Sequence, residues 1–294
     1  MLDVERDVSE VTSGETPQDT LARFERSAIS VETPNGEGKM VWHIWGSGPV
    51  LVLFHGGAGS WRHWIHNIEE LSKFYRLLVA DLPGLGDSVM PPDGEDADAI
   101  AAIVAAGIDE IIGTEATYDV AGFSFGSTMA VCVAAQRGAR VRSCTMIGSS
   151  AVGPAGSMIQ LLKVRKLEGQ ERVEAHRTNL NRLMIADPAK IDALALVIQE
   201  WNTVHSRLNT PALSRSGALM RALDHVHVPL NGIWGELDAP ANPRATERVK
   251  ILGELRPEAD LYLIKGAGHW VAYEAPEQVN EILLKVLART RPTN

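Results

Sequence analysis

Ser124 is the first candidate for chemistry because of the residues on both sides of it. An apolar stretch beginning at Tyr118 leads into Gly122-Phe123-Ser124-Phe125-Gly126 and then into a run of small residues. Glycine two positions before and two after a serine is typical of a sharp turn from a strand into a helix, where a larger side chain would collide with neighbouring backbone. Such a turn presents the hydroxyl above the carboxyl edge of a sheet, at the positive end of the helix. The pattern predicts a nucleophile at Ser124.

A serine hydroxyl is a weak nucleophile unless an imidazole accepts its proton and a carboxylate holds that imidazole. The chain offers both partners, in the order Ser, Asp, His. Asp238 comes just after an apolar strand pattern, and His269 comes just after the next one, within Gly266-Ala267-Gly268-His269-Trp270. Because the carboxyl ends of parallel strands meet at one edge of a sheet, we expect the three side chains to lie together. Asp119 is interpreted as a strand-start residue and not as a rival acid.

The elements that must position these residues alternate between strand and helix. Strand patterns occur at 50–55, 77–80, 118–123, 142–147, 229–234 and 260–264, and helical patterns at 96–112, 127–136, 244–252 and 276–287. This alternation predicts an α/β fold, with a mostly parallel central sheet and helices on both of its faces. A β-hairpin is predicted ahead of the sheet, with strands at 28–33 and 40–45 around the turn formers at 34–38.

The strand signal stops between the strand patterns at 142–147 and 229–234. Residues 150–228 are predicted to form a helical cap, inserted into a core domain made of residues 28–149 and 229–294. Residues 1–27 are predicted to be a polar leader, with a single helical turn near 21–26. Apolar residues at three- and four-residue spacing in the cap are expected to roof an apolar pocket over the nucleophile. They are Leu180, Leu183, Met184, Ile191, Leu194, Ile198 and Trp201.

The chain resembles the α/β-hydrolase fold family over residues 28 to 290, apart from the cap. Four motifs carry the resemblance: the sharp turn at Ser124, Asp238, His269 and the stretch His55-Gly56-Gly57. The resemblance implies an oxyanion hole formed by the backbone N–H groups of Gly57 and Phe125, each worth roughly 3 to 4 kcal/mol to the transition state. His55 is expected to shape its loop. Further residues expected to bind substrate, from their places beside the nucleophile and the base or in the cap, are Gly56, Phe123, Trp201 and Trp270.

Three functional classes follow from this resemblance. The first is a serine hydrolase that cleaves a small, fairly apolar ester or related acyl compound through an acyl-enzyme. The second is a hydrolase of carbon–carbon bonds in ring-cleavage products of aromatic degradation, because Trp61, Trp64 and the pair His269-Trp270 are similar to such enzymes. Those enzymes usually have Asn immediately before the nucleophile, where this chain has Phe123. The third is a ligand-binding or lyase member of the fold. The identities of the acyl and leaving groups do not follow from the sequence.

Composition restricts the partners and the compartment. A net charge of −9 argues against nucleic acid or an anionic membrane as partner, since both require a basic face. We expect a small-molecule substrate and no cofactor. The acidic first 20 residues lack the apolar segment of a signal peptide, so a cytoplasmic location is expected. His63 and His66 could imitate metal ligands, but we interpret them as a solvated helix face and predict no metal site. Oligomeric state does not follow from the sequence.

Overall fold

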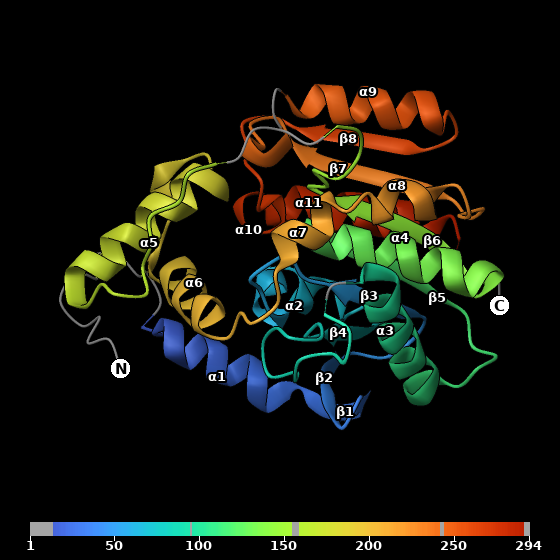
Figure 1. Ribbon diagram of the computed structural model, residues 1–294, viewed down its shortest axis with the longest axis horizontal. Helices are drawn as coiled ribbons and strands as arrows, with labels where there is room; N and C mark the ends of the chain where they lie inside the picture. Colours follow the sequence, from blue (N-terminus) through green and yellow to red (C-terminus); the bar gives the residue numbers. More distant parts are fainter. Residues whose placement is uncertain (1–13, 95, 155–158, 242–243, 291–294) are drawn as a thin grey trace.

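An eight-stranded sheet runs through the computed structural model, which describes residues 14–94, 96–154, 159–241 and 244–290 (Figure 1). The strands lie in the order β1-β2-β4-β3-β5-β6-β7-β8, and every pairing from β4 to β8 is parallel. Their bounds are β1 Ile29–Asn35, β2 Gly38–Trp45, β3 Val50–Phe54, β4 Arg76–Ala80, β5 Tyr118–Phe123, β6 Val141–Ile147, β7 Leu230–Gly235 and β8 Asp260–Ile264. The predicted α/β class and mostly parallel sheet are confirmed.

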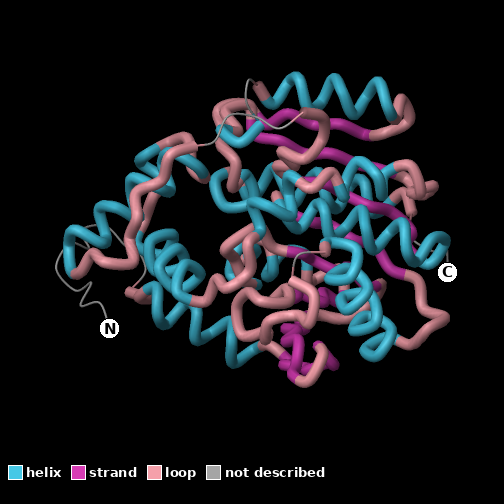
Figure 2. Tube along the Cα trace, viewed as in Figure 1, coloured by secondary structure: helices cyan, strands magenta, loops and turns pink. Residues whose placement is uncertain are grey.

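Helices cover both faces of this sheet (Figures 1 and 2). Their bounds are α1 Pro17–Ser27, α2 Ile68–Leu71, α3 Ala97–Ile112, α4 Phe125–Arg137, α5 Gly169–Leu183, α6 Ala193–Val204, α7 Thr210–Arg215, α8 Ala218–Leu223, α9 Ala245–Leu255, α10 Val271–Glu274 and α11 Pro276–Ala288. Helices α3 and α4 lie on one face, and α11 lies on the other. The parallel crossovers therefore bring the carboxyl ends of β5, β7 and β8 to one edge, with a helix or loop leaving each of them.

Strand β3 shows how the sequence builds a core on each face of the sheet. Its side chains alternate between two apolar clusters: Val52 and Phe54 pack with α3 and α4, whereas Leu51 and Leu53 pack with α11. All four are fully buried. A strand with apolar residues at every position is what a parallel sheet covered on both faces requires, and it explains the continuous apolar stretch in the sequence.

The N-terminal part of the described chain is more ordered than the sequence suggested. The predicted hairpin forms from β1 and β2, which pair antiparallel. The single helical turn expected near 21–26 is wrong, because α1 has 11 residues. Thr16 caps it, accepting a hydrogen bond at Oγ1 from the Asp19 N–H at 3.2 Å, and the Asp19 carboxylate accepts in return from the Thr16 N–H. Leu21 and Phe24 are buried on one side of this helix, in the apolar cluster that also contains Trp45 and Trp61. Of the polar leader predicted over residues 1–27, residues 1–13 lie outside the described residues.

Between β6 and β7 the described residues form helices α5 to α8 and no strand. Helix α5 packs on α6, which also contacts α1, and these helices stand to one side of the sheet (Figure 1). Helices α7 and α8 instead pack on α4, the helix that follows Ser124. The insertion therefore has two parts, and α7 and α8 form the part that packs on the helix after Ser124. In the described part of the chain, no helix has the length and apolar composition that a membrane span requires.

Candidate active site

Ser124 lies in a strained turn between β5 and α4. Its backbone has φ 53° and ψ −115°, in a region that side-chain-bearing residues rarely adopt. The flanking glycines are required by close packing: a Cβ on Gly122 would lie 2.0 Å from the carbonyl oxygen of Gly126, and one on Gly126 would lie 2.3 Å from that of Phe54. The Gly-x-Ser-x-Gly spacing is therefore needed for this backbone path, and the path turns the Ser124 hydroxyl toward His269.

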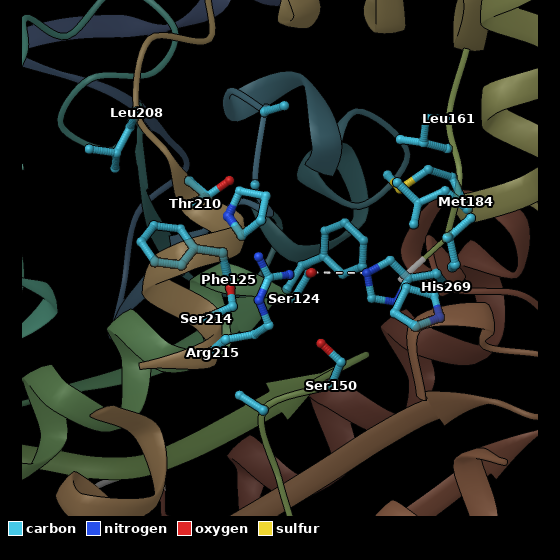
Figure 3. A pocket seen from close by; sticks show the side chains of 18 of the residues that line it. Ser124, Phe125, Ser150, Leu161, Met184, Leu208, Thr210, Ser214, Arg215 and His269 are labelled. Carbon is cyan, nitrogen blue, oxygen red and sulfur yellow. Dashed lines mark hydrogen bonds between the residues drawn. The ribbon is translucent and has the colours of Figure 1, made fainter. Parts of the chain in front are cut away.

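The structure brings Ser124, His269 and Asp238 into one chain of hydrogen bonds (Figure 3). His269 Nδ1 lies 2.9 Å from Asp238 Oδ2, and His269 Nε2 lies 2.9 Å from Ser124 Oγ. A carboxylate only accepts, so Nδ1 carries the proton and Nε2 accepts the hydroxyl proton of the serine. Asp238 and His269 are almost fully buried. This geometry allows the imidazole to remove the serine proton while the carboxylate stabilises the resulting imidazolium.

Close backbone packing holds the loop that carries Asp238 against the loop that carries His269, called the base loop below. A Cβ on Gly235, at the end of β7, would lie 2.2 Å from the carbonyl oxygen of Gly268, immediately before His269. The N–H of Ala241 donates to Asp238 Oδ1 at 3.0 Å, which fixes the second oxygen of that carboxylate. Asp119 has different partners, because its carboxylate forms an ion pair with Arg142 and accepts from Ser143 Oγ at 2.7 Å. Asp119 therefore holds the start of β5 to β6, and Asp238 is the carboxylate that reaches the imidazole.

The loop after β3 is shaped by two buried histidines. His55 Nε2 accepts from the Leu82 N–H at 2.9 Å, so its Nδ1 carries the proton and donates to the carbonyl oxygen of Gly56 at 2.7 Å. Because C=O and N–H of one peptide point in opposite directions, anchoring the Gly56 oxygen orients the N–H of Gly57 away from His55. His63 Nδ1 accepts from the Gly56 N–H at 3.2 Å. Both rings are fully buried, and burial lowers the pKa of each.

The other candidate donor of the oxyanion hole, Phe125, is the first residue of α4, where backbone N–H groups lack partners within the helix. Gly57 and Phe125 both line the pocket that contains Ser124 and His269. Both residues therefore lie beside the nucleophile, and the assignment of their N–H groups to an oxyanion hole stays a prediction.

His63 and His66, considered above as possible metal ligands, have other contacts in the structure. His63 supports the Gly56 backbone and His66 stacks against Tyr273, so the expectation that this stretch is a solvated helix face is wrong for His63, which is buried. The structure does place ligand atoms of His43, Asp81 and Asp87 within 4.8 Å of one another. Asp81 already accepts hydrogen bonds from the N–H groups of Trp61 and Asp87, at 2.8 and 3.0 Å, so its carboxylate organises two turns.

A pocket of about 570 Å³ opens above the nucleophile (Figure 3). Its volume is in the usual range for a small-molecule site, and its walls are mainly apolar. The apolar walls come from the turns around Ser124, the segment before α5, the end of α5 and the stretch from Leu208 to Met220. The apolar residues are Ala58, Phe123, Phe125, Ala151, Ile159, Leu161, Leu183, Met184, Leu208, Pro211, Met220 and Pro240.

Of the four residues expected to bind substrate, only Phe123 is among the residues that line the pocket. Gly56 does not line it, but a Cβ there would lie 2.9 Å from the Phe123 ring, so it makes room for that ring beside Ser124. Trp270 is fully buried because its side chain turns inward, and its Nε1 donates to the carbonyl oxygen of His63 at 2.9 Å. Trp201 stacks on His205 and lies under the Arg62 guanidinium instead of facing the pocket. For Trp201 and Trp270, the prediction of substrate contact is wrong.

Most of the predicted cap stripe also points elsewhere. Leu183 and Met184 line the pocket, whereas the other five residues do not. Leu180, Ile191 and Ile198 are buried in the apolar cluster shared with α11, and Leu194 packs against that cluster. These side chains hold the cap to the rest of the chain, because an apolar stripe serves packing and ligand contact equally well.

Sequence reasoning missed α7, which forms part of the pocket wall. Asn209 caps this helix, accepting from the Ala212 N–H, and Pro211 lies in its first turn, so a start signal was present in the sequence. Thr210 lies against the loop after β3: a Cβ on Gly57 would lie 2.5 Å from Thr210 Oγ1. Ser214 and Arg215 also line the pocket.

Glu274 joins the insertion to the loop that carries His269. It is nearly fully buried. One carboxylate oxygen accepts from the N–H groups of Ala186 and Gly268, at 3.1 and 2.7 Å, and the other accepts from that of Asp187 at 2.8 Å. Trp270 adds a backbone bond from its N–H to the Met184 carbonyl oxygen at 2.7 Å. The pocket-lining end of α5 is thus fixed directly to the base loop.

Comparison with known proteins gives matches over most of the chain. A family model described as "Alpha/beta hydrolase family" matches residues 51–282. The dihydrolipoyllysine-residue acetyltransferase component of the acetoin cleaving system of Pseudomonas putida is 30% identical over 256 residues, which are 82% of this chain and 64% of that protein. A 2-hydroxy-6-oxononadienedioate/2-hydroxy-6-oxononatrienedioate hydrolase of Pseudomonas sp is 25% identical over 255 residues, covering 82% of this chain and 88% of that protein. Among solved structures, the esterase RhEst1 from Rhodococcus sp. ECU1013 has a TM-score of 0.72 at 21% identity, with coverage of 89% and 98%.

Proposed function

Because the chain belongs to the alpha/beta hydrolase family, we propose that it is a serine hydrolase that cleaves a small ester or related acyl compound through an acyl-enzyme. The observation that carries this proposal is the pair of 2.9 Å contacts that join Asp238 to His269 and His269 to Ser124. A mainly apolar pocket of about 570 Å³ above the hydroxyl supports a small, partly apolar substrate.

In the first half of the reaction, Ser124 Oγ attacks the carbonyl carbon of the substrate while His269 Nε2 takes the hydroxyl proton. Negative charge develops on the carbonyl oxygen, where the N–H groups of Gly57 and Phe125 stabilise it. When the tetrahedral intermediate collapses, the bond to the leaving group breaks, and His269 gives its proton to the departing oxygen. The acyl group stays on Ser124.

In the second half, a water molecule attacks the acyl carbon and gives a proton to the same nitrogen. The bond from the acyl carbon to Ser124 Oγ breaks, the proton returns to Oγ, and a carboxylic acid leaves. Asp238 stays ionised throughout and stabilises the imidazolium in both halves.

We expect Ser124→Ala to fold like the native protein and to lose nearly all turnover, by about 10⁵-fold or more, because the oxyanion donors and the pocket remain but the nucleophile is gone. The measurement is the hydrolysis of p-nitrophenyl acetate and butyrate. A fluorophosphonate probe should modify Ser124 in the native chain, located by peptide mass spectrometry. Full activity in the variant, or modification at another residue, would rule out Ser124 as the nucleophile.

Carbon–carbon bond hydrolysis is the second candidate, and a specific observation favours it. The curated relatives include 2-hydroxy-6-oxononadienedioate and 2-hydroxymuconate semialdehyde hydrolases, the former matching 82% of this chain. The same three residues and the same pocket would then act on a ketone. A 2-hydroxy-6-oxo-dienoate loses its colour on cleavage, so its bleaching by the protein, without hydrolysis of the nitrophenyl esters, would favour this second function. Binding of either substrate without turnover would instead favour a ligand-binding member of the family.

A further inference from the structure

The pocket contains side-chain hydroxyl groups besides that of the nucleophile. They belong to Ser150, Ser206, Thr210 and Ser214. Thr210 differs from the three serines because only 4% of it is exposed, whereas they are partly exposed. Thr210 is the first residue of α7, so it belongs to the insertion. In Figure 3, Thr210 and Phe125 lie on one side of Ser124, and His269 lies on the other.

The Thr210 hydroxyl lies beside the candidate donors of the oxyanion hole. A Cβ on Gly57 would lie 2.5 Å from Thr210 Oγ1, so this oxygen is at most about 4 Å from the Cα of Gly57. The same Cβ would lie 3.9 Å from the Cβ of Phe125. An oxygen bound to the Gly57 N–H lies about 2.9 Å from that nitrogen. The Thr210 hydroxyl and the Gly57 N–H are therefore neighbours that can share one acceptor.

Within the described part of the chain, the Thr210 hydroxyl forms no hydrogen bond, although the Thr210 N–H donates to the Leu208 carbonyl oxygen at 3.0 Å. A threonine at the start of a helix commonly caps it. Here Asn209 caps α7 instead, because its side chain accepts from the Ala212 N–H at 3.4 Å. The donor of Thr210 is therefore available to a molecule in the pocket that this residue lines.

The segment that carries Thr210 is fixed to the loop after β4. The Arg207 N–H donates to the Gly84 carbonyl oxygen at 3.0 Å. The Arg207 guanidinium donates to the carbonyl oxygens of Gly86 and Ser88, at 2.9 and 2.5 Å. A donor stabilises a developing charge best when it is already in place, because no reorganisation is then needed during the reaction. Thr210 meets this condition.

We propose that the Thr210 hydroxyl is a third donor of the oxyanion hole, next to the N–H groups of Gly57 and Phe125. A tetrahedral oxyanion has three lone pairs, so it can accept from all three donors. Thr210 is then a catalytic residue, and the insertion supplies part of the machinery that stabilises the transition state. This inference rests on the proposed function, with Ser124 as the nucleophile, and adds a residue to it.

The test measures kcat and KM for p-nitrophenyl butyrate in the native protein and in Thr210→Val. Valine has nearly the shape of threonine, so it keeps the packing against Gly57 and removes only the hydroxyl group. We expect kcat to fall by about 10²-fold while KM stays within about threefold of the native value, because the bound ground state has no oxyanion. A native kcat in a folded Thr210→Val would overturn the inference, and so would a change confined to KM.

Further variants separate the donor from the packing of the side chain. Thr210→Ser keeps a hydroxyl group and should retain most of kcat. Thr210→Ala also lacks the hydroxyl and should lose kcat as Thr210→Val does, even if valine does not fit. Thr203→Val makes the same change on α6, where the hydroxyl donates to the Gln199 carbonyl oxygen at 2.7 Å outside the pocket lining, and should have the native kcat. Equal losses in Thr210→Ser and Thr210→Val would indicate packing and overturn the inference.

A ketone that cannot be cleaved tests the donor independently of ester turnover. Ser124 Oγ adds to the carbonyl carbon of 1,1,1-trifluorohexan-2-one, His269 takes the hydroxyl proton, and the carbonyl oxygen becomes a bound oxyanion. We expect the dissociation constant of this ketone, measured by fluorine NMR, to be about 10²-fold higher in Thr210→Val than in the native protein.

The outcomes of this measurement distinguish the donor from the proposed function. The expected difference in ketone binding, without turnover of any ester, would reject the proposed ester hydrolysis and keep Thr210 as a donor. Equal dissociation constants in the two proteins would reject the donor, whatever the esters show. Neither addition of the ketone nor turnover of an ester would reject both.

Discussion

Asp119 and Asp238 are both buried carboxylates, one in β5 and the other in the loop after β7, and their partners give them different roles. Asp238 reaches the imidazole of His269, and Asp119 forms an ion pair with Arg142 at the opposite end of β5. We expect Asp238→Asn to lower kcat by about 10³- to 10⁴-fold, because an amide can hold the ring in the wrong tautomer and cannot stabilise its charge. Asp119→Asn should retain most of kcat and lose about 1 to 3 kcal/mol of the free energy of unfolding, since the partly buried Arg142 loses its counter-charge.

The measurement for this pair is ester turnover at matched folded fraction, together with urea unfolding of each purified variant. Each variant serves as the control for the other, because both change one buried carboxylate into an amide. An inactive Asp119→Asn with an active Asp238→Asn would show that the wrong carboxylate had been assigned to the imidazole.

The contact between the insertion and α10 can be tested by changing Glu274. Glu274, at the end of α10, accepts hydrogen bonds from Ala186, Asp187 and Gly268. Glu274→Gln places an NH₂ group against at least one of these N–H donors, so we expect a loss of about 1 to 3 kcal/mol in the free energy of unfolding. We also expect a lower kcat, because Gly268 immediately precedes His269.

Urea unfolding and kcat should be measured beside Glu281→Gln, which makes the same chemical change at an exposed position of α11. If Glu274→Gln were as stable and as active as this control, the carboxylate would not be what fixes the insertion to the base loop.

Some helices and strands could be predicted from the sequence, and others could not. Strands β3 to β8 and helices α3, α4, α9 and α11 give strong local signals, because parallel strands are continuously apolar and the helices are long. The site could be predicted to the same extent, since Ser124, Asp238 and His269 each follow a strand whose neighbours the alternation fixes. The pocket could not be predicted. Leu180 and Met184 share one apolar stripe, yet only Met184 lines the pocket, and its backbone is bonded to Trp270 through a tertiary contact that the stripe does not reveal.

Considered as a whole molecule, the protein keeps several histidines out of contact with water. Burial lowers the pKa of His55, His63 and His176 from the ordinary value near 6.5. At pH 7.5 these rings are neutral whether the chain is folded or unfolded. As the pH falls below about 6.5, the unfolded chain takes up protons that the folded chain does not, so the free energy of unfolding decreases.

We therefore expect the urea midpoint to be lower at pH 5.5 than at pH 7.5. His63→Asn should reduce this difference by about 1 kcal/mol in unfolding free energy, because the amide oxygen can still accept from the Gly56 N–H but does not titrate. His225→Asn, at an exposed position, is the control. An equal pH difference in native protein and His63→Asn would contradict this account of the buried rings.

Three expectations rest on the composition of the whole chain: no nucleic-acid partner, no membrane partner and a cytoplasmic location. All three stay predictions. Composition bears on them only through the average charge of the surface. That average does not reveal Arg215, a cation in the pocket of an acidic chain, because its position depends on how α7 packs on α4.

The backbone of Ser124, at φ 53°, has an implication for how this protein can change over generations. Glycine adopts that conformation without the steric cost that serine bears, roughly 1 to 3 kcal/mol. Selection for thermal stability alone would therefore exchange the nucleophile for glycine and give a more durable but inert protein. A lineage that keeps serine at this position accepts a less stable fold in return for a reactive hydroxyl. Attempts to make the protein more heat-resistant should accordingly look for gains everywhere except at this turn.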